Sequence, residues 1–550
     1  MNESTTKRGL CMHENYTRDE IVTLPYGQLE GIRLTEARAI AWLGVPYAMP
    51  PVGRLRWKAP REIKPWSHRL SARKYRNSSV QISLEGPVGS EDCLYLNVWR
   101  PDHAEDGLPV LVFLHGGGNV SGSGRDFQGG QLAPETNSIV VTVNYRLGAM
   151  GFFRHPALRT GDPLDDSGNY GLLDIIHALK WVQRNIAYFG GNPANVTLAG
   201  QSAGARNALA ACLSPLSEGL VHKLFVMSGG FTTAKSELGE SKANAILRTL
   251  LLQKGLANNP DEADEWIANR SAEEIAGLLH QQNAASFAEA IGDTGLRMSA
   301  FPHLFEDGTV IPIGGFANLG LHGQPCLPIV LGSTATEFSV FALGDPYFLN
   351  EWQNGRLERQ AEEKSFYEAA VQYGSELYAS FNVEEVADKW MEASPENPVF
   401  AYRFHWGLRD GVIDPSIRFR LGASHGADIP FYTGDFTGVL QNFPAGVVTE
   451  RNEPGRRQLS DRMRSYLQRF LHTGDPNGEG LPHWKRWGAD PLSSDILALD
   501  ADEEQAVVRM DSKLLAQDIL SRLKKDARLT ADQRTWLQTR LFAGRFFWND

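Results

Sequence analysis

Residues 196–213 read VTLAGQSAGARNALAACL. The first four are apolar or β-branched, the next five form the pattern Gly-x-Ser-x-Gly, and an alanine-rich run of helical composition follows. This order of strand, tight turn and helix is the one in which a serine stands exposed at the top of a parallel sheet. The glycines keep the turn free of side chains, and the helix directs its N-terminus at Ser202. The stretch predicts an α/β fold with Ser202 as a candidate nucleophile.

Apolar runs on both sides of this stretch predict a parallel sheet. The runs of strand length are residues 110–114, 139–145, 196–199 and 224–227. Between the second and the third, residues 172–188 are apolar at helical spacing, and the glycines that follow are a strong helix stop. Strands that alternate with helices form a mostly parallel sheet with helices on its faces. Ligands of such folds bind at the carboxyl ends of the strands.

The chain after residue 230 is mainly helical in pattern. Residues 271–274 read Ser-Ala-Glu-Glu, a capping box that marks the start of a helix. Two more strands are expected at residues 329–331 and 400–404. No Pro/Ser-rich linker divides the chain. We expect a polar N-terminal arm over residues 1–23 and a single catalytic domain over residues 24–550, with helical insertions around 235–320 and 355–395.

The composition excludes several classes of function. The 550 residues carry a net charge of −11 with both signs scattered, so we expect neither a nucleic acid nor an anionic membrane surface as partner. The longest apolar runs are far below the roughly 18 residues that cross a bilayer. The four cysteines, Cys11, Cys93, Cys212 and Cys326, are too dispersed for a disulfide framework or a metal cluster. Residues 1–16 lack the apolar core of a signal peptide. We therefore expect a cytoplasmic protein, with a secreted form whose signal has been removed as the alternative.

A second Gly-x-Ser-x-Gly pattern occurs at residues 422–426. It follows the polar residues 414–420 instead of a strand, and it runs into Ile429-Pro430, which is expected to prevent a helix. Because the pattern lacks the strand and the helix, we interpret Ser424 as a loop serine without a chemical role.

A serine needs a general base, an acid that orients the base, and donors for the oxyanion. Residues 115–118 read His-Gly-Gly-Gly directly after a predicted strand, where bare backbone N–H groups can approach a substrate carbonyl. A glycine turn without a chemical role is the alternative for this segment. His425 is the best candidate base among 14 histidines. Periodicity alone does not choose Glu337 among the other carboxylates as the orienting acid.

Several long motifs, in the right order, resemble the carboxylesterase type B family. These α/β-hydrolases include bacterial para-nitrobenzyl esterases, cholinesterases and the non-catalytic neuroligins. The motifs are LGVPYAMPPVG at residues 43–53, EDCLYLNV at 91–98, the glycine loop at 115–118, NYRLG at 144–148, GNYGLLD at 168–174, WVQRNI at 181–186, the serine turn at 200–204 and TGDPN at 473–477. The resemblance covers the chain from about residue 24 to its C-terminal region.

The resemblance implies an α/β-hydrolase fold and a set of functional residues. The implied triad is Ser202, Glu337 and His425, the implied oxyanion donors are the N–H groups of Gly117, Gly118 and Ala203, and Ser228 is implied to hydrogen-bond the triad acid. The family needs no metal and no organic cofactor. The expected reaction is the hydrolysis of a small carboxylic ester through an acyl-enzyme.

The sequence also departs from the family pattern. Gln201 stands where a glutamate is usual, Asn119 where a phenylalanine is usual, and Arg206 where small residues are usual. For Arg206 we weigh binding of an acidic substrate against reaching into a polar network, and favour the second. Cys93 resembles a disulfide cysteine of the family, but residues 77–81 contain no partner for it.

Residues 77–92 contain no aromatic side chain, so the cation–π cage that cholinesterases use for choline esters is not expected. We interpret the protein as a serine carboxylesterase. The alternatives are a non-catalytic adhesion protein of the same fold, which would have lost its nucleophile, and an amidase or lactonase with the same triad. The sequence leaves monomer and homodimer open.

Overall fold

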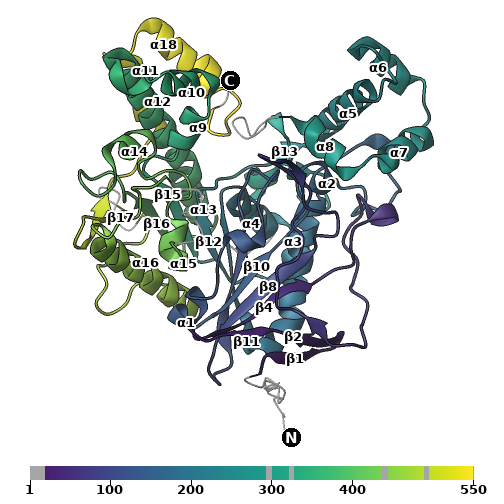
Figure 1. The fold of residues 1–550 in the computed structure, drawn as a ribbon, viewed down its shortest axis with the longest axis horizontal. Helices are drawn as coiled ribbons and strands as arrows, with labels where there is room; N and C mark the ends of the chain where they lie inside the picture. Colours follow the sequence, from purple (N-terminus) through teal and green to yellow (C-terminus); the bar gives the residue numbers. More distant parts are fainter. Residues whose placement is uncertain (1–18, 293–299, 321–326, 437–443, 489–494, 549–550) are drawn as a thin grey trace, which may run out of the picture.

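The computed structural model describes residues 19–292, 300–320, 327–436, 444–488 and 495–548. An 11-stranded sheet runs through the molecule in the order β18-β17-β16-β15-β12-β11-β9-β10-β8-β4-β3. Its strands are β3 (Ile32–Leu34), β4 (Ala39–Pro46), β8 (Tyr95–Pro101), β9 (Leu108–Leu114), β10 (Ile139–Val143), β11 (Gly191–Gln201), β12 (Lys223–Met227), β15 (Ile329–Thr334), β16 (Val399–Phe404), β17 (Ile496–Ala501) and β18 (Ala506–Asp511). The strands from β10 to β17 pair in parallel, and the outer strands pair antiparallel. The predicted α/β fold with a mostly parallel sheet is confirmed (Figure 1).

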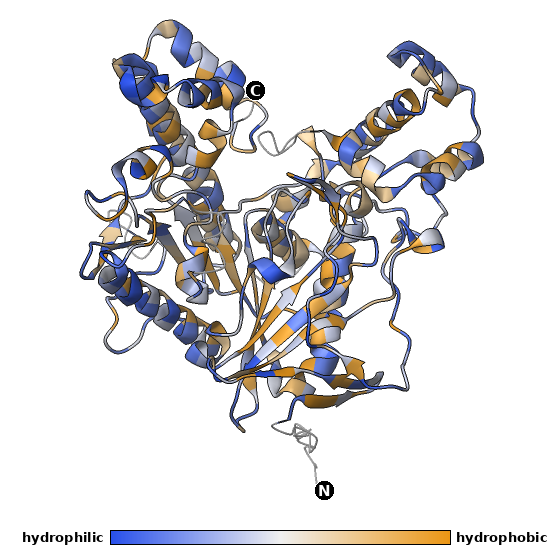
Figure 2. Ribbon diagram, in the orientation of Figure 1, coloured by the Kyte–Doolittle hydropathy of each residue, from blue (hydrophilic) through white to orange (hydrophobic). Residues whose placement is uncertain are grey.

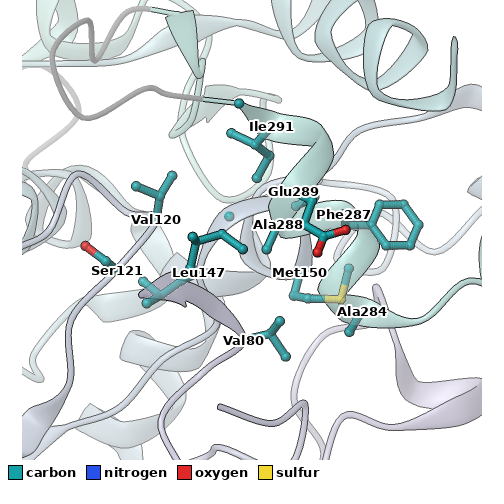
Figure 3. A pocket seen from close by; sticks show the side chains of 14 residues that line it. Val80, Val120, Ser121, Leu147, Met150, Ala284, Phe287, Ala288, Glu289 and Ile291 are labelled. Atoms are coloured by element: carbon teal, nitrogen blue, oxygen red, sulfur yellow. The ribbon is translucent and has the colours of Figure 1, made fainter. Parts of the chain in front are cut away.

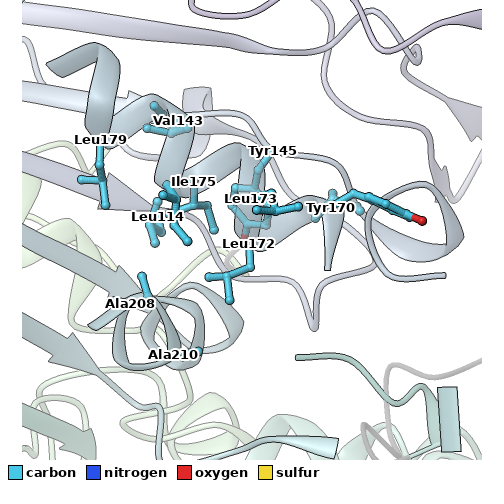
Figure 4. Packing of buried hydrophobic residues seen from close by; sticks show 14 of the residues in the cluster. Leu114, Val143, Tyr145, Tyr170, Leu172, Leu173, Ile175, Leu179, Ala208 and Ala210 are labelled. Carbon is cyan, nitrogen blue, oxygen red and sulfur yellow. The ribbon is translucent and has the colours of Figure 1, made fainter. Parts of the chain in front are cut away.

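Helices cover both faces of the sheet because alternate residues of each strand point to opposite sides. On β9, Val110, Val112 and Leu114 belong to a core shared with helices α3 (Tyr170–Asn185) and α4 (Ala203–Leu213) (Figure 4). The intervening Leu111 and Phe113 face a second core, to which α16 (Glu453–Thr473) contributes. Figure 2 shows the strands as hydrophobic and much of α16 as hydrophilic, as expected for a helix with one buried face.

The predicted elements are present with shifted ends. The helix expected at residues 172–188 is α3 followed by a short 3₁₀ turn, and it stops at Gly190, which adopts the left-handed conformation. The capping box at Ser271 begins α7 (Ala272–Gln281), as predicted. Of the expected arm over residues 1–23, most lies outside the described residues, and strand β1 (Ile21–Leu24) begins before the expected boundary.

Several helices of the described residues lie in the two regions where helical insertions are expected. Within residues 235–320 lie α5 (Ser236–Gln253), α6 (Pro260–Ala268), α7 and α8 (Ala284–Ile291). Within residues 355–395 lie α11 (Arg356–Arg359), α12 (Ala361–Ala379) and α13 (Glu385–Ala393). Helices α5 to α8 stand at the upper right of Figure 1, and α11 and α12 stand at the upper left. That residues 24–550 act as one catalytic domain stays a prediction.

One prediction about the second Gly-x-Ser-x-Gly pattern, at residues 422–426, is wrong. Ile429-Pro430 does not prevent a helix, because α15 (Ile429–Thr433) begins there with the proline in its first turn. The prediction was wrong because the first N–H groups of a helix have no partner within it, so a proline costs nothing at that position. Ser424 still follows no strand of the sheet. It pairs in an isolated bridge with Thr336.

Candidate active site

Ser202 lies at the sharp turn between β11 and α4. Its backbone has φ 58° and ψ −120°, a conformation that costs a non-glycine residue roughly 1–3 kcal/mol and is held by the surrounding structure. The Ser202 N–H donates to the Met227 carbonyl on the neighbouring strand at 2.8 Å. A Cβ atom on Gly204 would lie 2.1 Å from the Leu114 carbonyl oxygen, so only glycine fits there. The predicted strained turn is therefore present.

Glu337 lies three residues beyond β15 and is fully buried. Its carboxylate accepts hydrogen bonds from the Ser228 hydroxyl and from the Thr334 N–H, the latter at 2.8 Å. It also contacts Nδ1 of His425. Because a carboxylate only accepts, the hydrogen of a neutral His425 ring belongs on Nδ1, and Nε2 is left as the acceptor that a general base needs.

His425 comes from the loop that precedes α15, and its ring packs against two aromatic side chains. The ring centroids of Phe341 and Tyr378 lie 5.2 and 5.9 Å from that of His425. The imidazole is thus held by Glu337 on one edge and by apolar rings beside it, which restricts its rotation.

Gln201 occupies the acceptor side of His425. Its Nε2 lies 3.1 Å from Nε2 of His425, and within the described residues no hydrogen bond joins the Ser202 hydroxyl to the imidazole. A neutral amide can donate to this nitrogen, whereas an ionised glutamate could not. The structure therefore joins Ser228, Glu337 and His425 directly, and it places Gln201 at the atom that would receive the proton of Ser202.

The glycine loop after β9 carries two of the expected oxyanion donors. Gly117 and Gly118 have φ of 101° and 63°, and a Cβ atom on Gly117 would lie 2.2 Å from the Ser121 carbonyl oxygen. Neither glycine N–H donates a backbone hydrogen bond to a residue of the described ranges. The third expected donor is the N–H of Ala203, the first residue of α4, and such an N–H has no acceptor within its own helix.

Asn119 and Asn207 form a buried pair that sequence reasoning did not find. Each side chain donates to the other, with Asn119 Nδ2 to Asn207 Oδ1 at 3.0 Å and Asn207 Nδ2 to Asn119 Oδ1 at 2.8 Å. Both residues are 0% exposed. The only signal in the sequence was the departure at Asn119, and Asn207 carried no signal at all.

Arg206 lies one helical turn after Ser202 and is entirely buried. Its Nη2 donates to the Tyr378 hydroxyl at 2.7 Å, and its guanidinium lies 4.6 Å from the ring centroid of Phe546. The side chain thus takes part in a buried polar contact, the interpretation that the sequence favoured, but its charged end does not reach water.

A pocket of about 520 Å³ opens beside the glycine loop (Figure 3). Val120 and Ser121 line it from the loop, and α2 (Gly148–Gly151) and α8 line it from the other sides. The lining side chains are Val80, Ile82, Val120, Ser121, Leu147, Ala149, Met150, Ala284, Phe287, Ala288, Glu289 and Ile291. Glu289 is the one ionisable side chain in this lining, so the space suits uncharged apolar groups.

Cys93 is fully buried with a free thiol. Burial, together with the nearby Asp174, raises the pKa of the Cys93 thiol, which keeps it protonated and unreactive. Cys11 and Cys326 lie outside the described residues.

Among the described residues, no group of three His, Cys, Asp or Glu side chains is arranged to hold a metal ion. No helix within the described ranges has the length and apolar character needed to span a bilayer.

A strained serine turn between strand and helix, on a mostly parallel sheet covered by helices, defines the class of α/β-hydrolases. Residues 18–346 and 347–519 match the model of the Carboxylesterase family, and the chain belongs to this family. This membership confirms the resemblance seen in the sequence motifs.

The relatives are esterases and hydrolases. Para-nitrobenzyl esterase of Bacillus subtilis is 31% identical over 500 residues, which are 88% of this chain and 95% of the relative. The pyrethroid hydrolase Ces2a of Mus musculus is 29% identical over 525 residues, 88% of each chain. A solved structure of a PNB esterase superposes with a TM-score of 0.69 at 29% identity, and covers 92% of this chain and 99% of its own. The protein is accordingly a carboxylic ester hydrolase, and the non-catalytic alternative is not favoured.

Proposed function

We propose that the protein hydrolyses esters through an acyl-enzyme on Ser202. In this mechanism the Ser202 hydroxyl attacks the ester carbonyl while Nε2 of His425 takes its proton, and the protonated imidazole then gives that proton to the leaving alcohol. Water repeats the sequence on the acyl-enzyme and releases the acid. The observation that carries the proposal is the contact of His425 Nδ1 with the buried Glu337, which leaves Nε2 as the base, on the side of Gln201, the residue before Ser202.

The remaining groups would stabilise the charges that form. The N–H groups of Gly117, Gly118 and Ala203 are the proposed donors to the oxyanion of the tetrahedral intermediate. Glu337, held by Ser228 and Thr334, would stabilise the imidazolium without taking a proton itself. For turnover, the amide of Gln201 must leave Nε2 so that the Ser202 hydroxyl can reach it.

The pocket beside the glycine loop indicates the kind of ester. Its lining is apolar apart from Ser121 and Glu289, so we propose that it takes the apolar acyl or alcohol group of a neutral ester. An anionic group would meet the carboxylate of Glu289, and repulsion of like charges would disfavour it.

For the cellular location we propose the cytoplasm, supported by the free thiol of the buried Cys93, and cell fractionation tests this.

The two serine patterns provide a matched test of the mechanism. Ser202→Ala should lower kcat for a chromogenic aryl ester by about 10⁴- to 10⁶-fold without unfolding the protein, because the nucleophile acts as a unit with its base. Ser424→Ala is the control and should keep wild-type turnover. An organophosphonate should label the peptide that contains Ser202. A label on the peptide that contains Ser424 would overturn the assignment.

A further inference from the structure

We propose that the buried pair of Asn119 and Asn207 is a positioning element, which holds the glycine loop in register with the serine turn. The inference rests on the proposed function, because it assigns a role only if the N–H groups of Gly117 and Gly118 receive the oxyanion. Neither asparagine touches the reacting atoms. Their proposed effect is on the distance between those donors and Ser202.

The pair joins the two segments that must be aligned. Asn119 directly follows Gly118, and Asn207 lies on α4, five residues after Ser202. Two opposed hydrogen bonds, of 3.0 and 2.8 Å, connect them without solvent access. Two opposed hydrogen bonds between side-chain amides fix both the distance and the orientation of the loop relative to α4, whereas an apolar contact would allow the loop to slide.

Asn119 is also fixed through its backbone. It has φ 61°, in the left-handed region where asparagine is tolerated better than most residues, and its carbonyl accepts from the Gly148 N–H at 2.7 Å. The end of the glycine loop is therefore held by the side chain of Asn119 toward α4 and by its carbonyl toward α2.

Tyr145 fixes the beginning of the same loop. Its buried hydroxyl donates to the His115 carbonyl at 2.7 Å. The loop is thus fixed at its beginning by Tyr145, which directly precedes Arg146 after β10, and at its end by the bonds of Asn119 to Asn207.

The physical reason for such a positioning element lies in the geometry of oxyanion stabilisation. Donors contribute to catalysis only when they lie about 2.7–3.1 Å from the position of the developing oxyanion. A small displacement of the loop therefore weakens stabilisation of the transition state more than binding of the substrate. Loss of the pair should therefore lower kcat and leave KM nearly unchanged. A role limited to folding would lower the melting temperature and leave kcat intact.

The test compares Asn119→Gly, Asn207→Ala and the double variant in the full chain. Glycine accepts the positive φ at position 119, so this variant removes the amide without backbone strain. We expect each single variant to lose about 10- to 100-fold in kcat for an aryl ester, with KM within threefold of wild type. Because the bonds are shared, the double variant should lose no more than the larger single loss. Inactivation by an organophosphonate, whose oxygen occupies the oxyanion site, should slow in parallel.

Asn185→Ala is the matched control. Asn185 is another buried asparagine, and its side chain donates to the Trp181 carbonyl within α3. Its loss should lower the melting temperature without changing kcat. If the Asn207 variant does not fold, Asn119→Asp replaces it in the test. This variant keeps the shape of the side chain and the oxygen that accepts from Asn207 Nδ2, but it loses the donor to Asn207 Oδ1. A lowered kcat at unchanged KM supports the proposal.

The proposal is overturned if the variants keep kcat within twofold of wild type, or if the effects of the two single variants simply add. Failure of the proposed function has a different result. In that case Ser202→Ala keeps its turnover, or the wild-type protein turns over no ester, whatever the asparagine variants do.

Discussion

Asp428→Asn should make the stability of the protein less sensitive to pH. Asp428 is fully buried three residues after His425, and its Oδ2 accepts a hydrogen bond from the Tyr402 hydroxyl at 2.6 Å. Burial raises the pKa of Asp428 from 3.8 to about 6; the Tyr402 hydrogen bond opposes the rise, and the charge of Glu337 adds to it. Above the raised pKa the folded protein holds a buried carboxylate, whereas the unfolded chain holds a solvated one.

The sign and size of the effect follow from this difference. A pKa that is higher in the folded state contributes stability below the unfolded value of 3.8, and this contribution is lost as the pH rises through about 6. A difference of about 2 pH units, at 1.36 kcal/mol per unit, amounts to about 3 kcal/mol, of which about 2 kcal/mol falls between pH 4.5 and 8. With an unfolding entropy of about 2.1 cal/mol/K per residue, 2 kcal/mol changes the Tm of a chain of this length by about 2 °C.

The assay is thermal unfolding of wild type and variant at pH 4.5 and pH 8, at one scan rate. The amide that the substitution introduces cannot ionise but can still accept from Tyr402, so the Tm of the variant relative to wild type should rise by about 2 °C between the two pH values. Asp261→Asn, on the exposed face of α6, is the control and should show no such trend. A difference in Tm that is equal at both pH values, or that falls toward pH 8, would refute the reasoning.

Three further predictions concern the site and the thiols. Since residues 77–92 contain no aromatic side chain, a neutral ester should exceed a choline ester of the same size in kcat/KM by about 30-fold, the equivalent of about 2 kcal/mol; equal values contradict this. Thiol titration of the denatured protein should find four free groups and reductant should leave activity unchanged, whereas two groups would reveal a disulfide. Gln201→Ala should keep kcat at or above the wild-type value, because the amide that competes for Nε2 of His425 is gone; a fall of more than tenfold would show that Gln201 assists turnover.

Much of the fold was predictable because its signals are local. The β-branched runs of β9 to β12 alternate with helical periodicity, and this alternation is sufficient for a parallel sheet. The need for glycine at position 204 could be predicted from its spacing to Ser202 alone. A strand that turns sharply into a helix brings the two backbones into contact, independently of the rest of the chain. The error at Ile429-Pro430 was also local: the same dipeptide can end a helix or begin one, and its neighbours did not decide which.

The partners of Ser202 needed more than local pattern. Glu337 was chosen only through the family resemblance, because nothing in the sequence around it separates this carboxylate from the others. Its contacts with Ser228 and His425 depend on the order in which β12, β15 and β16 lie in the sheet. A pairing of residues that are 88 apart in the chain has no periodicity to reveal it.

By itself, the sequence determined the class of fold, the serine turn and the bare glycine loop, since each depends on backbone requirements that a few adjacent residues meet or fail to meet. Only the tertiary structure decided that Gln201 lies at Nε2 of His425 and that Asn119 and Asn207 bond each other. Such contacts arise at one end of the sheet, where the ends of strands converge with the loops and helices that follow other strands. Side chains there form hydrogen bonds with residues that are distant in the chain. Such pairs produce no regular spacing in the sequence from which they could be predicted.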